Sequence, residues 1–401
     1  MKKLLSLVFA CALAFGTVVP IYASENVASV TSEELTTIKN GSMASLKGSE
    51  NTFYALSVLA DGADEASMKQ METTTLKAQE ALATSSRASA QEVEKLILLS
   101  EGLGFDSTHY VLNGETVNLF TVLEGKTITL VNDYTFALEA LYSAGYTPAK
   151  ESNLNKDALI QTLLKLRNPI DQAWNYNADY SGSYGSSDPD TTAMVLSALA
   201  PYANQDAKTM GISDDTKAAV DAAVIAGFQY LSSMQGVSGA MDNGYGENAS
   251  TTALTILAMT AYGKDVLTDH QFIQNGKSLL DGLMNYKNAE NLGFEVANWQ
   301  TGEMELNLEF STEQGLRALV ALQNSKVNTP YYLYQAGAFA NENRKQQPII
   351  EPEEKPVVTP QEQEKKEEPI IKDTAKQNKE HGAICLLLLV GAGVFAIRKY
   401  A

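Results

Sequence analysis

A repeated helical segment constrains the fold of this chain more than any other feature of its sequence. Three copies carry a threonine near the start of an apolar run, and these threonines recur at a spacing of about 60 residues: Thr192, Thr252 and Thr312. Weaker copies lie upstream, beginning at Asn51, Gln91 and Asn132. Copies of one unit predict an architecture in which each unit buries its apolar surface against its neighbours.

The copies themselves are predicted to be buried helices. Four of them begin with residue types that favour helix N-caps, namely Asn132, Asp190, Ser250 and Ser311. Ser89 with Glu92 matches a capping box in a further copy. The residues that follow are apolar almost all round, as in the run from Met194 to Leu199, which is typical of helices buried on most sides.

Amphipathic segments separate these helices. A stripe of apolar residues begins after Thr216 and contains Val220, Val224, Phe228 and Leu231. A second begins after Asp269 and contains Ile273, Gly276, Leu280 and Leu283. Such helices have one solvated face. The alternation predicts an all-α fold, an α6/α6 toroid with two concentric rings and all inner N-termini at one end.

Both ends of the chain are predicted to lie outside this toroid. Residues 1–23 have the basic start, apolar stretch and small-residue cleavage site of a signal peptide. The toroid domain is assigned to residues 24–345. Residues 346–381 form a Pro-, Glu- and Lys-rich stalk, and residues 382–401 form an apolar membrane anchor with a basic tip. We expect an extracellular, membrane-anchored protein on a Gram-positive-type cell. The tail is similar to a sortase sorting signal but lacks Leu-Pro-x-Thr-Gly.

Composition excludes several classes of function. The net charge of −18 argues against a nucleic-acid binder. The two cysteines, Cys11 and Cys385, lie in the predicted signal and anchor, so the domain is expected to contain neither disulfides nor thiolate metal sites. The histidines His109, His270 and His381 show no spacing typical of metal ligands. No metal and no cofactor are predicted.

The loops that enter the inner helices are predicted to meet at one mouth of the toroid. In the last three repeats these loops are rich in glycine and aromatic residues, and the aromatics expected at the mouth are Trp174, Tyr176, Tyr184, Tyr245 and Trp299. A concave aromatic mouth indicates a small-molecule site. The alternative is that these rings only pack the loops onto the rim.

The repeats resemble those of the terpenoid cyclase and protein prenyltransferase superfamily. The segment YLSSMQGVSG from Tyr230 is similar to its QW-type repeat, and the resemblance covers roughly Val27–Glu342. Within DPDTTA, Asp188 and Asp190 match the acid motif of class II cyclases, where Asp190 would take the place of the proton donor. Thr191 stands where that motif ends its run of aspartates. The zinc ligands of the prenyltransferases have no counterpart.

The segment DTTAM from Asp190 also resembles the inner-helix starts of the cobalamin carriers, intrinsic factor and transcobalamin. That resemblance implies ligand contacts from polar residues at the inner N-termini: Asp133, Asp190, Asn248 and Glu313, with Asp188 beside them. The carriers close over the corrin ring with a small β domain. Here the predicted stalk begins at that point, so the affinity should be lower, or a partner chain would have to act as the lid.

Three functions remain open from the sequence. The first is a tethered receptor that binds a small molecule without turnover, with cobalamin or another corrinoid as the possible ligand. The second is a terpenoid-cyclase-like or carbohydrate-active enzyme, in which Asp190 would pair with Glu247 or Glu313. The third is adhesion or protein interaction. The stretch around Asp190 is first the start of a helix, and we expect that carboxylate to accept a hydrogen bond from a ligand.

Overall fold

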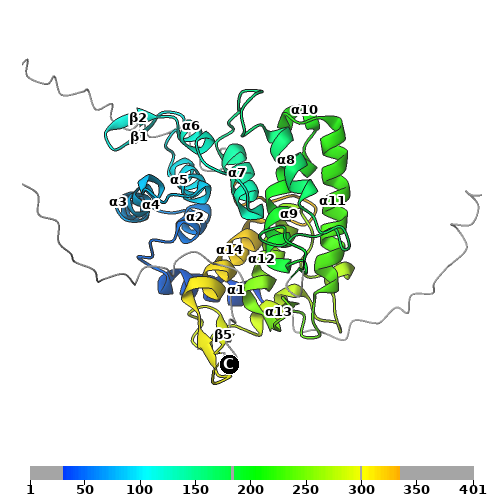
Figure 1. The fold of residues 1–401 in the computed structure, drawn as a ribbon. Helices are drawn as coiled ribbons and strands as arrows, with labels where there is room; N and C mark the ends of the chain where they lie inside the picture. Colours follow the sequence, from blue (N-terminus) through cyan, green and yellow to red (C-terminus); the bar gives the residue numbers. More distant parts are fainter. Residues whose placement is uncertain (1–29, 182–184, 299, 335–401) are drawn as a thin grey trace, which may run out of the picture.

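The inner helices of the protein form a closed ring. A computed structural model describes residues 30–181, 185–298 and 300–334. In this part of the chain the inner helices are α2 (Thr52–Ala60), α5 (Ala90–Gly102), α7 (Val131–Ser143), α9 (Pro189–Asn204), α12 (Ala249–Ala261) and α14 (Glu313–Asn324). Each packs against the next, and α14 returns to α2 (Figure 1). The α/α ring predicted from the repeats is therefore confirmed.

A second layer of helices surrounds the ring. Its principal members are α1 (Ser32–Ser45), α4 (Thr75–Thr84), α6 (Leu119–Glu124), α8 (Lys156–Lys165), α11 (Asp214–Ser233) and α13 (Leu279–Met284). Helix α1 packs on α14, α4 and α6 on α5, α8 on α7, α11 on α9, and α13 on α12. Two shorter helices also belong to this layer. Helix α3 (Glu65–Thr73) packs on α4, and helix α10 (Ala207–Met210) packs on both α11 and α9.

The two predicted outer helices have different outcomes. Helix α11 follows the predicted stripe, with Val220, Phe228 and Leu231 buried. The continuous helix predicted from Asp269 is wrong. A single turn of 3-10 helix covers His270–Phe272, the chain then reverses, and α13 begins only at Leu279. The break has a local cause, because Asn275 and Gly276 adopt φ angles of 49° and 72°, which a right-handed helix cannot contain.

The predicted N-caps are also displaced. The caps of α7, α9 and α12 are Leu130, Asp188 and Asn248, each two residues before the expected Asn132, Asp190 and Ser250. Ser311 lies inside a π-helical turn, η3 (Leu308–Thr312), capped by Asn307. Ser89 occupies the cap position of α5, but its side chain makes no capping bond, so the predicted capping box is wrong. The expected caps thus lie inside the first helical turns.

The periodic threonines anchor the loops that enter the inner helices. Each accepts a backbone N–H from an apolar residue upstream, and all three of those residues are fully buried. The pairs are Thr192 with Trp174 at 3.1 Å, Thr252 with Met241 at 2.8 Å, and Thr312 with Phe294 at 3.0 Å. The repeat that identifies the fold is therefore a structural device that fixes each loop against its helix.

Short antiparallel hairpins lie at both ends of the ring. Strands β3 (Met241–Asp242) and β4 (Glu247–Asn248) precede α12, and β5 (Glu295–Ala297) and β6 (Met304–Leu306) precede α14. They therefore lie on the mouth side. Strands β1 (Tyr110–Leu112) and β2 (Glu115–Val117) follow α5 and lie at the other end (Figure 1).

Aromatic side chains fill the interior of the ring. Phe53 on α2 and Phe136 on α7 have ring centroids 5.6 Å apart. Because α2 and α7 are not neighbours in the ring, this contact crosses its axis. Tyr334 lies 6.3 Å from Phe53 and 5.8 Å from Tyr332, which in turn lies 5.4 Å from Tyr142 on α7. The segment that follows α14 thus enters the lumen.

The predicted signal peptide (1–23), stalk (346–381) and anchor (382–401) lie outside the described residues. Among the residues that are described, no helix combines the length and the apolar character needed to span a bilayer. The predicted membrane attachment and extracellular location therefore stay predictions from the sequence.

Candidate functional site

Glu94 is the most deeply buried acid of the ring. It lies on α5, is 0% exposed, and neither carboxyl oxygen has a hydrogen-bond partner in the described part of the chain. Burial raises its pKa well above the usual value, and the nearby acids Asp133 and Glu139 raise it further. These surroundings therefore favour the protonated form of Glu94, which has both a donor and an acceptor to satisfy.

Asp133 on α7 is held on both of its oxygens. Oδ2 accepts from the backbone N–H groups of Thr129 and Leu130 at 2.9 Å each, and Oδ1 accepts from Gln91 Nε2 at 2.7 Å. These bonds fix the start of α7 and tie it to α5. Asp133, predicted as a ligand contact, thus already has structural partners, and it supplies negative charge next to Glu94.

Tyr176 covers this part of the mouth. Its carbonyl accepts from Val131 N at 3.1 Å, which attaches the loop before α9 to the start of α7. Its phenol is 36% exposed and faces Gln91 and Asp133. Partial burial raises the phenol pKa, and the Gln91 side chain opposes that rise. Tyr176 is therefore an aromatic face beside the buried acids, and its predicted contact with a ligand stays a prediction.

Glu139 lies deeper on α7, inside the lumen. Burial raises its pKa to about 8, although the Arg317 charge and the Tyr332 hydroxyl both oppose that rise. Arg317 on α14 pairs with Glu313 through Nε and Oε1 at 2.8 Å and through Nη2 and Oε2 at 2.9 Å. Its guanidinium also lies 4.5 Å from the centre of the Phe53 ring. Glu313, a predicted ligand contact, is therefore occupied by a buried ion pair.

Asp190 lies in the first turn of α9. The residue is half-buried, yet its Oδ1 atom is buried without a hydrogen bond in the described residues. Burial and the neighbouring Asp188 carboxylate raise its pKa to about 7, and the Thr251 hydroxyl on α12 opposes the rise. At neutral pH Asp190 can therefore donate a proton to a ligand oxygen as well as accept one, whereas the sequence suggested acceptance only.

Asp188 and Asn248 act as helix caps. Asp188 accepts from Asp190 N at 3.1 Å and from Thr191 N at 3.2 Å, and Asn248 accepts from Thr251 N at 2.9 Å. Pro189 occupies the first helical position after Asp188, where its fixed φ suits a helix start. Both predicted ligand residues thus have structural tasks at the mouth.

Neither suggested partner of Asp190 presents a free carboxylate. Glu313 is paired with Arg317. Glu247 accepts from the backbone N–H of Ser238 at 3.3 Å and from the Ser238 hydroxyl. A Cβ at Gly236 would lie 1.8 Å from Glu247 Oε1, so the loop is packed tightly around this side chain. Glu247 therefore holds the β3–β4 hairpin together.

The predicted aromatics of the mouth separate into different groups. Trp174 is 0% exposed and its indole donates to Leu163 O at 2.9 Å, so it packs the loop onto α8. Tyr245 is 79% exposed at the tip of the β3–β4 hairpin. Tyr184 and Trp299 lie outside the described residues. Among the described aromatics of this set, Tyr176 is the one that faces the buried acids.

Sequence reasoning missed a set of buried oxygens that recurs around the ring. Consecutive inner helices each carry, within their first five residues, a buried side-chain oxygen without a hydrogen bond in the described part of the chain. We call these the mouth oxygens, and they belong to Glu94, Asn132, Asp190, Thr251 and Gln314, of which the Asp190 and Thr251 groups are next to each other. The sequence alone did not single out Glu94, because Gln91, Glu92 and Lys95 stand beside it in the same helix. The described residues contain no grouping of three His, Cys, Asp or Glu side chains suited to a metal ion.

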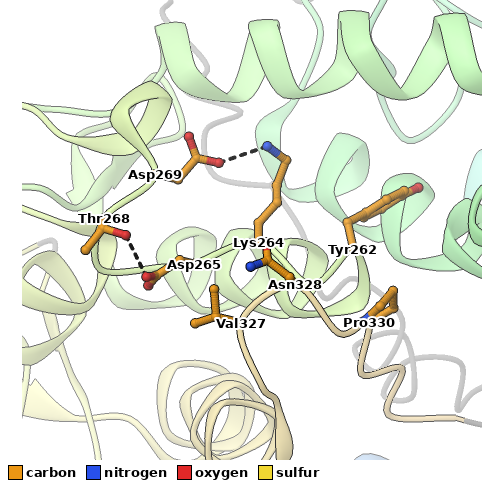
Figure 2. Close-up of a pocket in the computed structure, with 9 residues that line it drawn as sticks. Tyr262, Lys264, Asp265, Thr268, Asp269, Val327, Asn328 and Pro330 are labelled. Atoms are coloured by element: carbon orange, nitrogen blue, oxygen red, sulfur yellow. Dashed lines mark hydrogen bonds and ion pairs between the residues drawn. The ribbon is translucent and has the colours of Figure 1, made fainter.

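A separate hollow lies at the opposite end of the ring. It measures about 530 Å³ and lies between the turn after α12 and residues 327–330. Figure 2 shows its charged side chains paired with one another: Lys264 reaches Asp269 at 2.9 Å, and Thr268 donates to Asp265 at 2.6 Å. These polar groups already have partners, in contrast to the mouth oxygens.

No protein-family model matches the chain. No curated protein matches it at a significant level either. Among solved structures the chain is similar to one described as glycosyl hydrolase family 88 from Bacteroides vulgatus. The TM-score is 0.47 and the sequence identity 14%, over 73% of this chain and 97% of that one. The toroid class rests on the closed ring itself, and the resemblance to terpenoid cyclases and cobalamin carriers stays a prediction.

Proposed function

We propose that the protein binds an uncharged, hydroxyl-rich small molecule of the saccharide class at the mouth of its helical ring. The mouth oxygens carry this proposal. A buried polar group without a hydrogen bond costs about 1–3 kcal/mol, so a ligand that supplies donors to several of them gains affinity. Sugar hydroxyls supply such donors and also accept from a protonated carboxyl.

Charge at the mouth supports a neutral ligand. Asp133 and Asp188 lie close to the mouth oxygens, and the cations Lys95 and Arg317 are already paired with Glu92 and Glu313. An anionic ligand would meet like charges in a region of low dielectric. Tyr176 adds a partly exposed aromatic face, a feature that suits the apolar face of a sugar ring. The extracellular, tethered location predicted from the sequence remains part of this proposal.

The experiment is a titration calorimetry series with the mature chain. Matched neutral and uronic saccharides, together with cobalamin and cobinamide, form the ligand panel. We expect neutral saccharides to bind and the matched uronic forms to bind at least about tenfold more weakly, which corresponds to about 1.4 kcal/mol. Corrinoid binding with no saccharide binding would replace this proposal by the corrinoid receptor. No heat with any ligand would reject both.

Variants locate the site. Asn132→Leu removes one mouth oxygen at nearly constant volume and should weaken saccharide binding about tenfold. The matched control is Asp265→Asn in the hollow at the opposite end, which should leave binding unchanged. Equal effects of the two variants would move the site away from the mouth. Product analysis on the same panel tells binding from hydrolysis, since hydrolysis requires a second catalytic carboxyl near Asp190.

A further inference from the structure

The chain after α14 turns back into the ring. Asn328 N donates to Gly263 O and Tyr331 N donates to Thr260 O, each at 2.9 Å, so the segment runs along the C-terminal end of α12. Tyr332, Leu333 and Tyr334 are then 7%, 2% and 3% exposed. This segment therefore enters the lumen from the end opposite the mouth.

Its contacts place it on the axis. Tyr332 packs edge-on against Tyr142 of α7, with centroids 5.4 Å apart. Tyr334 packs on Phe53 of α2, and its hydroxyl lies 3.4 Å from Arg317 Nη1 on α14. Helix α7 is a ring neighbour of neither α2 nor α14. A segment that contacts all three helices must lie between them, inside the ring.

The segment shares hydroxyl groups with the proposed ligand. It presents two hydroxyls and two flat rings to the lumen, with the Tyr332 hydroxyl beside Glu139. Glu139 is close enough to Glu94 for the two acids to influence each other. The segment therefore forms the floor beneath the mouth oxygens, and a ligand that reached past Glu94 would meet Tyr332.

Few polar contacts hold the segment in place. Among the described residues, no backbone hydrogen bond joins residues 332–334 to the ring. The bond between Tyr334 and Arg317 is long at 3.4 Å, and such a hydrogen bond is weak. Apart from the bond from Tyr331 N to Thr260 O and the Tyr332 hydroxyl beside Glu139, the segment is held mainly by contacts between apolar surfaces.

We infer that Tyr331–Tyr334 is a removable plug, an internal occupant of the lumen that competes with the ligand for the ring interior. The competition rests on the proposed function, but the mobility of the plug does not. Withdrawal would expose Glu139, Phe53 and Tyr142, and would extend the mouth into a deep pocket. The apparent affinity for a ligand that uses this pocket would then rise with the fraction of open molecules.

The first test needs no ligand. Leu333→Cys and Leu319→Cys are made in the mature chain with Cys385→Ser, and thiol labelling is followed under native conditions. Leu319 lies on α14, is 0% exposed, and serves as the matched buried leucine. We expect Leu333→Cys to label at least about tenfold faster, because plug withdrawal costs less than unfolding of the ring. Equal labelling rates would overturn the plug.

A second variant tests how the plug is held. Tyr334→Phe keeps the ring and removes the hydroxyl beside Arg317, so labelling of Leu333→Cys should accelerate about threefold. Tyr245→Phe, at an exposed hairpin tip, should leave the rate unchanged. A rate that Tyr334→Phe does not alter would overturn the role of Arg317 in holding the plug.

The third test addresses competition. A saturating saccharide that binds the mouth should accelerate labelling of Leu333→Cys, and Tyr334→Phe should lower its Kd about threefold. A ligand that slows labelling would overturn the competition while leaving the proposed function intact. If no saccharide binds, the proposed function fails, and the labelling difference between Leu333→Cys and Leu319→Cys still decides the plug.

Discussion

Two parts of the ring differ in the kind of polar side chain that their inner helices bury. Helices α5 and α7 bury acids among their apolar residues, namely Glu92, Glu94, Glu101, Asp133 and Glu139. Along its whole length, α12 buries threonines as its polar side chains: Thr251, Thr252, Thr255 and Thr260. A threonine can satisfy itself locally, as Thr255 does by donating to Thr251 O at 3.0 Å.

An ionised carboxyl on an inner helix cannot donate such a hydrogen bond to its own helix. It must find partners across the ring, become protonated or receive a ligand. Asp133 finds backbone and glutamine donors, Glu313 finds Arg317, and Glu94 has no hydrogen bond within the described chain. The comparison therefore assigns scaffolding to α12 beyond Thr251, its one mouth oxygen, and assigns recognition mainly to the side formed by α5 and α7.

The largest effect should come from breaking the buried ion pair between Arg317 and Glu313, which lies beside the acids of α7. Arg317→Met leaves Glu313 buried without its cation, and we expect a loss of about 3–5 kcal/mol in the free energy of unfolding. Lys217→Met is the control, because the Lys217–Asp221 pair is exposed and worth about 0–1 kcal/mol. Urea denaturation measures both. Equal losses in the free energy of unfolding would mean that burying Glu313 without its cation costs little.

The next largest effect is expected in the pH dependence of stability, through the buried acids of α5 and α7. Because the pKa of Glu139 is raised to about 8 in the folded state, the folded chain binds more protons than the unfolded chain between the two pKa values. The stabilisation that protonated Glu139 contributes is fully present below its pKa in the unfolded chain, and it is lost as pH rises through about 8. Glu139 alone contributes a fall of up to about 1.4 kcal/mol per pH unit.

Denaturation at several pH values, with Glu139→Gln as the variant, isolates this contribution. The variant should flatten the decline between neutral pH and about 8. A decline as steep as that of the parent would assign the dependence to Glu94 or Asp190 instead.

A smaller effect of opposite sign is expected at Glu94. Glu94→Met removes two unbonded buried oxygens at similar volume and should stabilise the chain by about 1–2 kcal/mol. The same change should weaken saccharide binding. Thermal unfolding and calorimetric titration on one preparation give both numbers, and a destabilised variant would show that Glu94 has a structural partner.

The smallest effect is expected on the α12 side. Thr255→Val exchanges a self-satisfied hydroxyl for a methyl group, with a change of about 1 kcal/mol or less and no effect on ligand affinity. Denaturant midpoints and binding constants, measured beside those of Glu94→Met, complete the comparison. A large loss of affinity here would extend recognition around the whole ring.

The sequence allowed the ring to be predicted because threonine spacing and helices that are apolar all round depend on local pattern. The N-caps were displaced because SDPD and ENAS each offer two capping residues two positions apart, and the extended backbone selects the earlier one. Trp174 could not be placed from its type, since a buried anchor and a ligand platform use the same residue.

The site was predictable in part. Asp190 and Tyr176 were predicted as ligand residues and stay predictions, whereas Glu94 was not singled out because Glu92 and Lys95 stand beside it in the sequence. The lumen segment was not predictable, because PYYLY has no periodic pattern and its position depends on helices that meet only after the ring has closed. Its burial follows from the contacts of α2, α7 and α14 rather than from any preference of its own.

Ring closure has a consequence for the order in which the chain can mature during synthesis. The last inner helix, α14, packs against the first two helices of the chain, α1 and α2. Gln323 on α14 donates to Thr36 on α1 at 3.1 Å, across a separation of 287 residues. Contacts this distant in sequence form late, since the loop entropy is lost before they compensate for it. Until α14 leaves the ribosome, the nascent arc has open apolar edges on α2 and α12. The final 12-residue helix of the ring thus decides when the first one becomes stable.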